Sequence, residues 1–241
     1  METMTAVLSK FGGRNKNQDY CGHLESKTGS IWIVADGMGG HLGGEMASYL
    51  AVNTILEQFT KNHSVEEENI IQLLNLANQV VLQKQQEMID YHSMQSTICL
   101  AASNDDKTIF ANVGDARGYY FSNGEISYQT RDHSLPQLLV NQGEIYEWEI
   151  RHHEDRNKVL KSIGKENSLS PSLYQIQRPE KGDALLLCSD GFWELIYEQE
   201  MEVDLAKSTT PEQWLRKMEL RLLKRMPQRH DNYSAIAVLF Q

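Results

Sequence analysis

Three aspartates stand beside apolar segments that lie far apart in the chain. Asp36 and Asp190 each end such a segment and precede a glycine, and Asp231 comes shortly before the closing apolar run 235–240. A short apolar segment is typical of a buried strand, and glycine lets the backbone that follows bend and approach a ligand. Grouped carboxylates suit hard cations such as Mg²⁺ and Mn²⁺, which prefer oxygen ligands. The pattern predicts that these three side chains converge around one or two such ions.

Each Asp-Gly pair also has a plainer explanation, since a turn after a strand often carries these two residues. For either pair alone we weigh a turn and a metal site equally, but both pairs together with Asp231 favour the metal site. Gly37 adds a backbone carbonyl that can face an ion, because no side chain blocks it. Near the start, Arg14 has a planar guanidinium suited to phosphate oxygens, and Asp19 is a further oxygen donor. Taken alone, that segment reads as a solvated loop.

The overall composition limits the classes of partner. The 241 residues suit one large domain or two small ones, and 40% of them are hydrophobic, which is enough for a packed core. The 23 basic and 33 acidic residues give a net charge of -10. An acidic chain of this kind is not expected to have nucleic acid or an anionic membrane as its main partner.

The lack of recognisable targeting segments and the pattern of cysteines both favour a cytoplasmic location. The first residues lack the basic and apolar regions of a signal peptide, and no apolar run approaches the roughly 18 residues that cross a bilayer. Cys21, Cys99 and Cys188 are scattered without metal-ligand spacing. We therefore expect reduced thiols in a cytoplasmic protein and no zinc site.

The secondary-structure pattern predicts strands joined by short turns, with helices inserted in blocks. The expected strands cover 5–8, 20–24, 31–35, 97–101, 108–113, 117–121, 125–129, 183–188 and 235–240. One helix is expected over 45–59, a second from Ser64 with Glu67 in a capping box and an end near Asp90, and a third from Thr210. This order favours the α+β class with largely antiparallel sheets.

The stretch 136–171 is polar and irregular, and it lacks the apolar residues for a core of its own. We interpret it as a flap inserted into a single domain that spans 1–241.

Eight short motifs follow in order over nearly the full length: Arg14-x-x-Asn17-Gln18-Asp19; Val34-Ala35-Asp36-Gly37-Met38-Gly39-Gly40-His41; Ser96-Thr97; Val113-Gly114-Asp115-Ala116-Arg117; Thr130-Arg131-Asp132-His133-Ser134; Arg156-Asn157-x-Val159-Leu160 with Ile163-Gly164; Ser189-Asp190-Gly191-Phe192-Trp193-Glu194; and Asp231-Asn232-Tyr233-Ser234. Each motif alone is weak, but the ordered set is specific. With them, the chain resembles a bacterial member of the PPM family of metal-dependent protein phosphatases, the PP2C type.

The resemblance implies a two-sheet antiparallel β-sandwich flanked by helices on both sides, with two Mn²⁺ or Mg²⁺ ions at one end. By motif match, Asp36 would bridge both ions and the Gly37 carbonyl would bind one of them. Asp190 and Asp231 would hold the other ion. Asp115 falls where bacterial members add a third, weaker ion that is shared with Asp190.

Two further residues and the flap receive roles from the same resemblance. Asp19 would sit at or just behind the ions, and Arg14 would bind the substrate phosphate. The flap, 136–171, corresponds to the variable segment that shapes substrate choice. Two departures stand out: Gln18 replaces a glutamate of many relatives, and His41 lies five residues after Asp36, whereas some relatives place a candidate acid histidine directly after the Asp-Gly pair.

The implied activity is hydrolysis of phosphoserine and phosphothreonine in proteins by a metal-activated water. The implied partners are phosphorylated proteins, among them the targets of a cognate Ser/Thr kinase, and the chain is expected to act as a monomer. Two rival interpretations stay open from the residues alone: a non-enzymatic relative that binds phosphoproteins, and a hydrolase of small phosphate esters.

Overall fold

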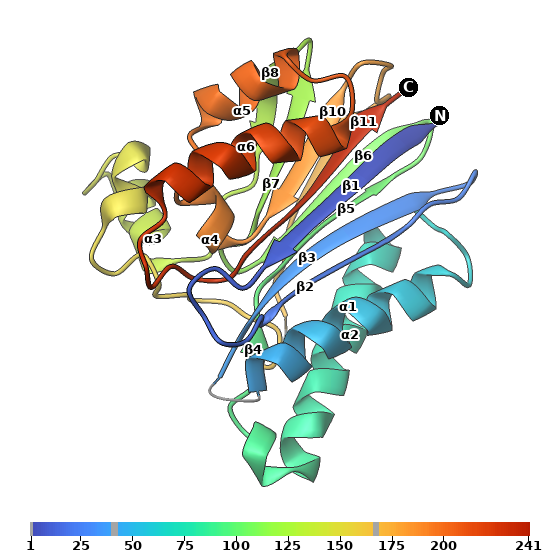
Figure 1. Ribbon diagram of the computed structural model, residues 1–241. Helices are drawn as coiled ribbons and strands as arrows, with labels where there is room; N and C mark the ends of the chain where they lie inside the picture. The colour runs from blue at the N-terminus through green and yellow to red at the C-terminus, as the bar shows by residue number, and fades with distance from the viewer. Residues whose placement is uncertain (1, 40–42, 166–168) are drawn as a thin grey trace.

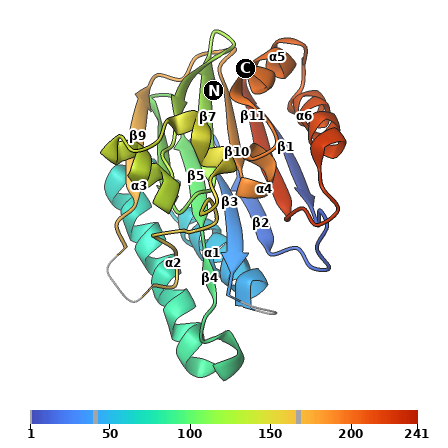
Figure 2. The same ribbon diagram turned by 90° about the vertical axis from the view of Figure 1, so that its left-hand side faces the viewer.

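Two antiparallel sheets lie face to face and helices cover their outer faces (Figure 1, Figure 2). The computed structural model describes residues 2–39, 43–165 and 169–241. The five-stranded sheet has the order β1 (Thr3–Lys10), β11 (Tyr233–Phe240), β10 (Ala184–Cys188), β7 (Arg117–Ser122) and β8 (Glu125–Gln129). The six-stranded sheet has the order β2 (Asp19–Leu24), β3 (Ser30–Met38), β5 (Ile98–Ser103), β6 (Lys107–Val113) and β9 (Ser172–Gln177), and β4 (Gln95–Ser96) pairs with β3.

The helices form the two outer layers. On the six-stranded sheet lie α1 (Gly43–Phe59) and α2 (Glu67–Glu87), followed by the short η1 (Ile89–Tyr91). The other sheet is covered by α4 (Asp190–Trp193), α5 (Glu198–Ala206) and α6 (Pro211–Arg225). Between β8 and β9 come α3 (Leu135–Gln142) and η2 (Glu147–His152). The expected α+β sandwich with helices on both sides is therefore confirmed.

The apolar strands are buried on both faces, which explains their nearly continuous hydrophobic sequences. On β3, Ile31 and Ile33 face the α1 and α2 layer, whereas Trp32 and Val34 face the other sheet. The core between the sheets also holds the aromatic side chain of Phe110. Because side chains alternate along a strand, one run of apolar residues fills two hydrophobic layers and fixes the register of the strand that ends at the candidate site.

Two local predictions are wrong, and each has a physical reason. The second helix begins at Glu67 rather than at Ser64, and its N-cap residue Glu66 makes no side-chain cap. Val65 is only 2% exposed in the core under α1 and α2, so its burial keeps this stretch extended.

The flap is also more regular than expected, because it contains α3 and η2. The Ser134 hydroxyl accepts a hydrogen bond from the Gln137 amide, Pro136 occupies the first turn, and Gly143 ends α3 in the left-handed conformation. These are standard helix-boundary signals, so the sequence did contain the evidence for this helix.

Three further features complete the comparison with expectation. All three cysteines are free, and Cys99 and Cys188 are buried. In the described parts of the chain, no helix combines the length and the apolar character that crossing a membrane requires. The strand β9 and the helix α5 were not anticipated from the sequence.

Helix α6 offers a matched test of the outer layer. Leu222 is fully buried and its neighbour Leu223 is 44% exposed. Leu222→Ala should lower the free energy of unfolding by about 2–5 kcal/mol, because it leaves a cavity under the helix. Leu223→Ala should lower it by well under about 1 kcal/mol. Urea unfolding of both variants measures the difference, and equal losses would contradict the described packing.

Candidate metal centre

Two aspartates of the six-stranded sheet lie directly opposite each other. Asp19 is the first residue of β2 and pairs in register with Asp36 on β3. The backbone of Asp36 is held from the other side, since its carbonyl accepts from the Thr97 amide at 2.8 Å and from the Ser96 hydroxyl at 2.9 Å. The Ser96-Thr97 motif therefore fixes the end of β3 that carries Asp36.

The other sheet contributes two more aspartates at the same edge. Asp190 follows the last residue of β10 by two positions, and Asp231 precedes the first residue of β11 by two. Because β10 and β11 are antiparallel neighbours, these two chain ends meet. The Ser189 hydroxyl joins the sheets, since it accepts from the Ser234 amide at 3.0 Å and donates to Asp19 Oδ2 at 2.8 Å.

The carboxylates from the two sheets interact directly. Burial is the largest cause that raises the pKa of Asp36 well above its usual range, followed by the charges of Asp190, Asp19 and Asp115. The pKa of Asp190 is also raised, first by burial and then by the charge of Asp231, while a hydrogen bond with Asp36 opposes that rise. Asp190 is thus within electrostatic reach of the other four predicted aspartates.

Asp115 approaches the group from the turn between β6 and β7. It is 3% exposed, and burial together with the charge of Asp190 raises its pKa. Its backbone carbonyl accepts a hydrogen bond from the Trp193 indole at 2.9 Å. Asp115 is therefore tied to the short helix α4, which begins with Asp190.

Gly37 has a packing role that its sequence motif did not reveal. A Cβ atom at this position would lie 1.9 Å from the Gly44 carbonyl oxygen and 2.8 Å from that of Gln18. Only glycine therefore allows the end of β3 to approach the start of α1. The metal-binding role of its own carbonyl stays a prediction, and the candidate acid His41 lies outside the described residues.

The guanidinium of Arg14 is not free to bind phosphate in this structure, because it is engaged in an ion pair. Its Nη2 atom donates to Asp231 Oδ2 at 2.7 Å, and both side chains are about half exposed. The pairing of β1 with β11 brings these residues together across 217 positions of sequence. The residue expected to bind phosphate therefore neutralises one of the residues expected to bind an ion.

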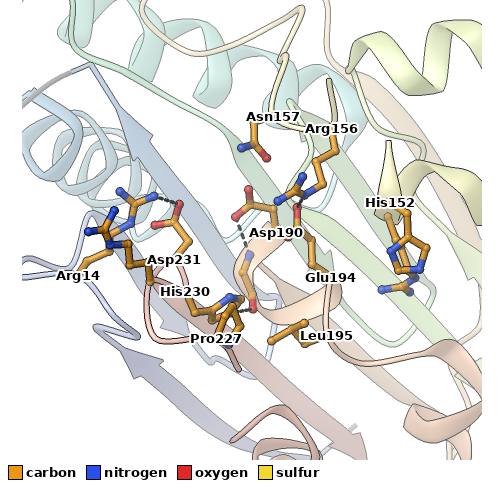
Figure 3. A pocket seen from close by; sticks show the side chains of 13 residues that line it. Arg14, His152, Arg156, Asn157, Asp190, Glu194, Leu195, Pro227, His230 and Asp231 are labelled. Carbon is orange, nitrogen blue, oxygen red and sulfur yellow. Dashed lines mark hydrogen bonds and ion pairs between the residues drawn. The ribbon is translucent and has the colours of Figure 1, made fainter. Parts of the chain in front are cut away.

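A cavity of about 510 Å³ opens beside this cluster. Arg14 and Asp231 lie on one side of Asp190, and Arg156 and Glu194 lie on the other (Figure 3). Arg156 Nε donates to the Glu194 carboxylate at 3.0 Å, and burial followed by the charge of Asp190 raises the pKa of Glu194 to about 7.

The donor chemistry of the cluster fits a divalent cation. All five side chains are carboxylates, and Asp19 Oδ1 is buried without a hydrogen-bond partner in the described structure. A cation would relieve both the unpaired oxygen and the repulsion between the acids.

The carboxylates of the cluster are not already arranged as a coordination sphere for an ion. Within the described residues, no three side chains of the Asp, Glu, His and Cys types are grouped closely enough to hold an ion. The oxygens are instead engaged locally: Asp190 Oδ1 accepts from the Gly191 amide, and Asp231 accepts from Arg14 and from the Asn232 amide. Binding an ion would therefore require these side chains to exchange partners.

Asn232 organises the site in a way that sequence reasoning missed. Its side chain accepts from the Gln18 amide at 2.8 Å and donates to the carbonyls of Phe11 and Lys16 at 2.9 and 2.8 Å. It is 4% exposed. The sequence signal for this role was an asparagine placed between Asp231 and the apolar strand β11. The residues that it contacts lie more than 200 positions away in the chain, so the sequence did not reveal them. Asn232 holds the loop of Arg14 against the start of β11.

Comparisons with known proteins agree with this architecture. The family described as protein phosphatase 2C matches residues 12–228. The serine/threonine phosphatase stp of Listeria welshimeri is 34% identical over 202 residues, covering 81% of this chain and 79% of that protein. Protein phosphatase PhpP of Streptococcus pneumoniae is 34% identical over 203 residues, covering 82% and 81%. The crystal structure of serine/threonine phosphatase Stp1 from Staphylococcus aureus superposes with a TM-score of 0.89 at 28% identity, covering 100% of this chain and 96% of that one.

The buried acids should make the metal-free chain less stable as pH rises. Burial raises the pKa of Asp19 from 3.8 to about 7, opposed by the Ser189 hydrogen bond, so the folded state holds a proton that the unfolded state has lost between these values. In EDTA, the titration of Asp19 alone should lower the free energy of unfolding by about 1 kcal/mol from pH 6 to pH 8, and the other carboxyl groups of raised pKa act in the same direction. Asp36→Asn should flatten this slope, since it removes a second carboxyl group whose raised pKa makes the folded state lose stability as pH rises.

Urea unfolding at the two pH values measures the slope. The exposed Asp106→Asn serves as the matched control and should keep the wild-type slope. A metal-free chain that becomes more stable from pH 6 to pH 8 would contradict the electrostatic description of the cluster.

Proposed function

The chain belongs to the protein phosphatase 2C family and is a serine/threonine phosphatase, and from this premise we propose that its clustered aspartates hold two Mn²⁺ or Mg²⁺ ions for the hydrolysis of phosphoserine and phosphothreonine in proteins. The observation that supports this most is the meeting of aspartates from both sheets beside the Arg14 cavity.

The proposed ligands follow from position and chemistry. Asp36 and the Gly37 carbonyl would hold one ion, and Asp190 and Asp231 would hold the other, with Asp36 near enough to contribute to both. Asp115 would contribute to a weaker third site with Asp190. When bound, the ions acidify a water molecule for attack on phosphorus and neutralise negative charge on the phosphoryl oxygens.

The protein residues bind and orient the substrate. Arg14 is paired with Asp231 at 2.7 Å, so a cation that takes Asp231 would release the guanidinium. A released guanidinium offers two parallel N–H donors to the substrate phosphate. Asp19, behind the cluster and bonded to Ser189, would hold the edge of the two sheets in place. Arg14 therefore links occupation of the ion site to phosphate binding.

The cellular setting is a proposal as well. We place the protein in the cytoplasm as a monomer that acts on the targets of a cognate serine/threonine kinase. Its three free cysteines suit a reducing compartment.

Asp190→Ala and Asp36→Ala should each lower kcat/KM for a phosphothreonine peptide by about 100-fold or more, because each removes a proposed ion ligand. Phosphate release with Mn²⁺, repeated with EDTA, measures the effect, and circular dichroism checks the fold. The exposed Asp106→Ala is the control with the same loss of charge. Wild-type activity in either site variant would refute the ligand assignment.

Arg14→Ala should raise KM for the same peptide by about tenfold and lower kcat less, because the guanidinium mainly binds the phosphate. Lys10→Ala removes one positive charge from an exposed position nearby and should leave KM near the wild-type value. An unchanged KM in Arg14→Ala would remove its proposed role.

A further inference from the structure

The cavity beside the aspartates carries more positive groups than one phosphate requires. Its lining contains four arginines and two histidines against three carboxylates: Arg14, Arg151, Arg156, Arg229, His152, His230, Asp190, Glu194 and Asp231. The chain as a whole has a net charge of -10, whereas the arginines of this cavity outnumber its carboxylates by four to three.

Two of the arginines are neutralised within the cavity. Arg14 pairs with Asp231, and Arg156 pairs with Glu194, one pair on each side of Asp190 (Figure 3). On the proposed function, ions would take over the charges of Asp190 and Asp231. The loaded cavity would then have a clear positive surplus, of which a single phosphate accounts for only part.

Arg229 is the exposed part of this surplus. Within the described residues its guanidinium has neither a hydrogen-bond partner nor an ion-pair partner. The backbone around it is well held, because the Gly13 amide donates to the His230 carbonyl at 2.8 Å and His230 Nε2 lies 2.6 Å from the Gly191 carbonyl. A Cβ at Gly13 would lie 3.0 Å from the Arg229 Cα, so Arg229 is placed directly beside the loop of Arg14.

Arg151 adds positive charge to the flap side of the cavity. Its side chain is 6% exposed, and its Nη2 atom donates to Glu198 at 2.5 Å. Its Nη1 atom is buried and has no hydrogen-bond partner in the described structure. His152, the next residue, also lines the cavity and is exposed. On the flap side, Arg151 and Arg156 are each paired with a glutamate, so among the described residues that line the cavity only Arg229 presents a guanidinium that is both accessible and unpaired.

We propose that this cavity selects phosphopeptides that carry a second anionic group, a carboxylate or another phosphate, close to the phosphorylated residue, and that Arg229 is the main contact of that group. This rests on the proposed function, since it assumes that the phosphorylated residue is placed at the aspartates. The backbone of Arg229 packs against Gly13, the residue before Arg14, so two neighbouring backbone segments each contribute a guanidinium to the cavity lining. A peptide with a neutral or basic neighbour leaves Arg229 without a partner or repels it.

The test uses phosphothreonine peptides of one length that differ only beside the phosphothreonine, with glutamate, glutamine, lysine or a non-hydrolysable phosphonate analogue of phosphoserine at the flanking positions. With Mn²⁺ at low ionic strength, we expect kcat/KM for the glutamate peptide to exceed that of the glutamine peptide by about threefold to fivefold, as for a partly exposed ion pair. The lysine peptide should fall below the glutamine peptide, and 0.5 M salt should compress the differences. The phosphonate peptide separates a preference for a phosphate-like group from one for carboxylate.

Arg229→Ala should reduce the glutamate-to-glutamine ratio to near one, and Arg229→Lys should retain most of it. Lys224→Ala, which removes an exposed positive charge from α6 outside the cavity, should keep the wild-type ratio. Hydrolysis of all peptides at equal kcat/KM would overturn the inference and leave the proposed function intact. A preference that survives in Arg229→Ala would overturn the assignment of Arg229. Failure to hydrolyse any peptide with Mn²⁺ would overturn the proposed function itself.

Discussion

Mutual repulsion among clustered carboxylates, of which Asp19 and Asp115 are buried, is the constraint on which the rest of this structure depends. Asp19 and Asp36 come from one sheet, Asp190 and Asp231 from the other, and Asp115 from the turn that joins them. Burial and neighbouring negative charge both oppose ionisation of such a group, so a fold that holds it together must supply the stability elsewhere. The two hydrophobic clusters beneath the helix layers and the core between the sheets supply it.

Strand pairing and a few buried polar side chains hold the acids in place. Antiparallel neighbours bring distant chain segments to one edge, and the Ser189 hydroxyl then bridges the sheets through Asp19. Asn232 fixes the loop that carries Arg14, and the Trp193 indole connects Asp115 with α4. Asp19 and Asp115 are thus held by neighbours that have no proposed chemical role of their own. Supporting hydrogen bonds of this kind explain how a cluster of acidic side chains is kept at the end of a tightly packed sandwich.

The sequence was most informative where burial and chemistry coincide. Apolar runs that end in Asp-Gly located Asp36 and Asp190. A strand buried on both faces is a continuous apolar run, so its first polar residue marks the end of the strand. It was least informative where distant contacts decide the local structure, as when burial of Val65 delays the start of α2. The partners of Asn232 and the free guanidinium of Arg229 depend on loops that meet only in the folded chain. The cap of α3, in contrast, was present in the sequence at Ser134 and was overlooked because the surrounding residues are polar.

Anomalous diffraction from crystals grown with Mn²⁺ would test the central claim most directly. The account predicts two strong manganese peaks between the sheets, in contact with the carboxylates of Asp36, Asp190 and Asp231, with the Arg14–Asp231 ion pair broken. Crystals that bind no manganese there at millimolar Mn²⁺, or that bind it only at other acids, would contradict it.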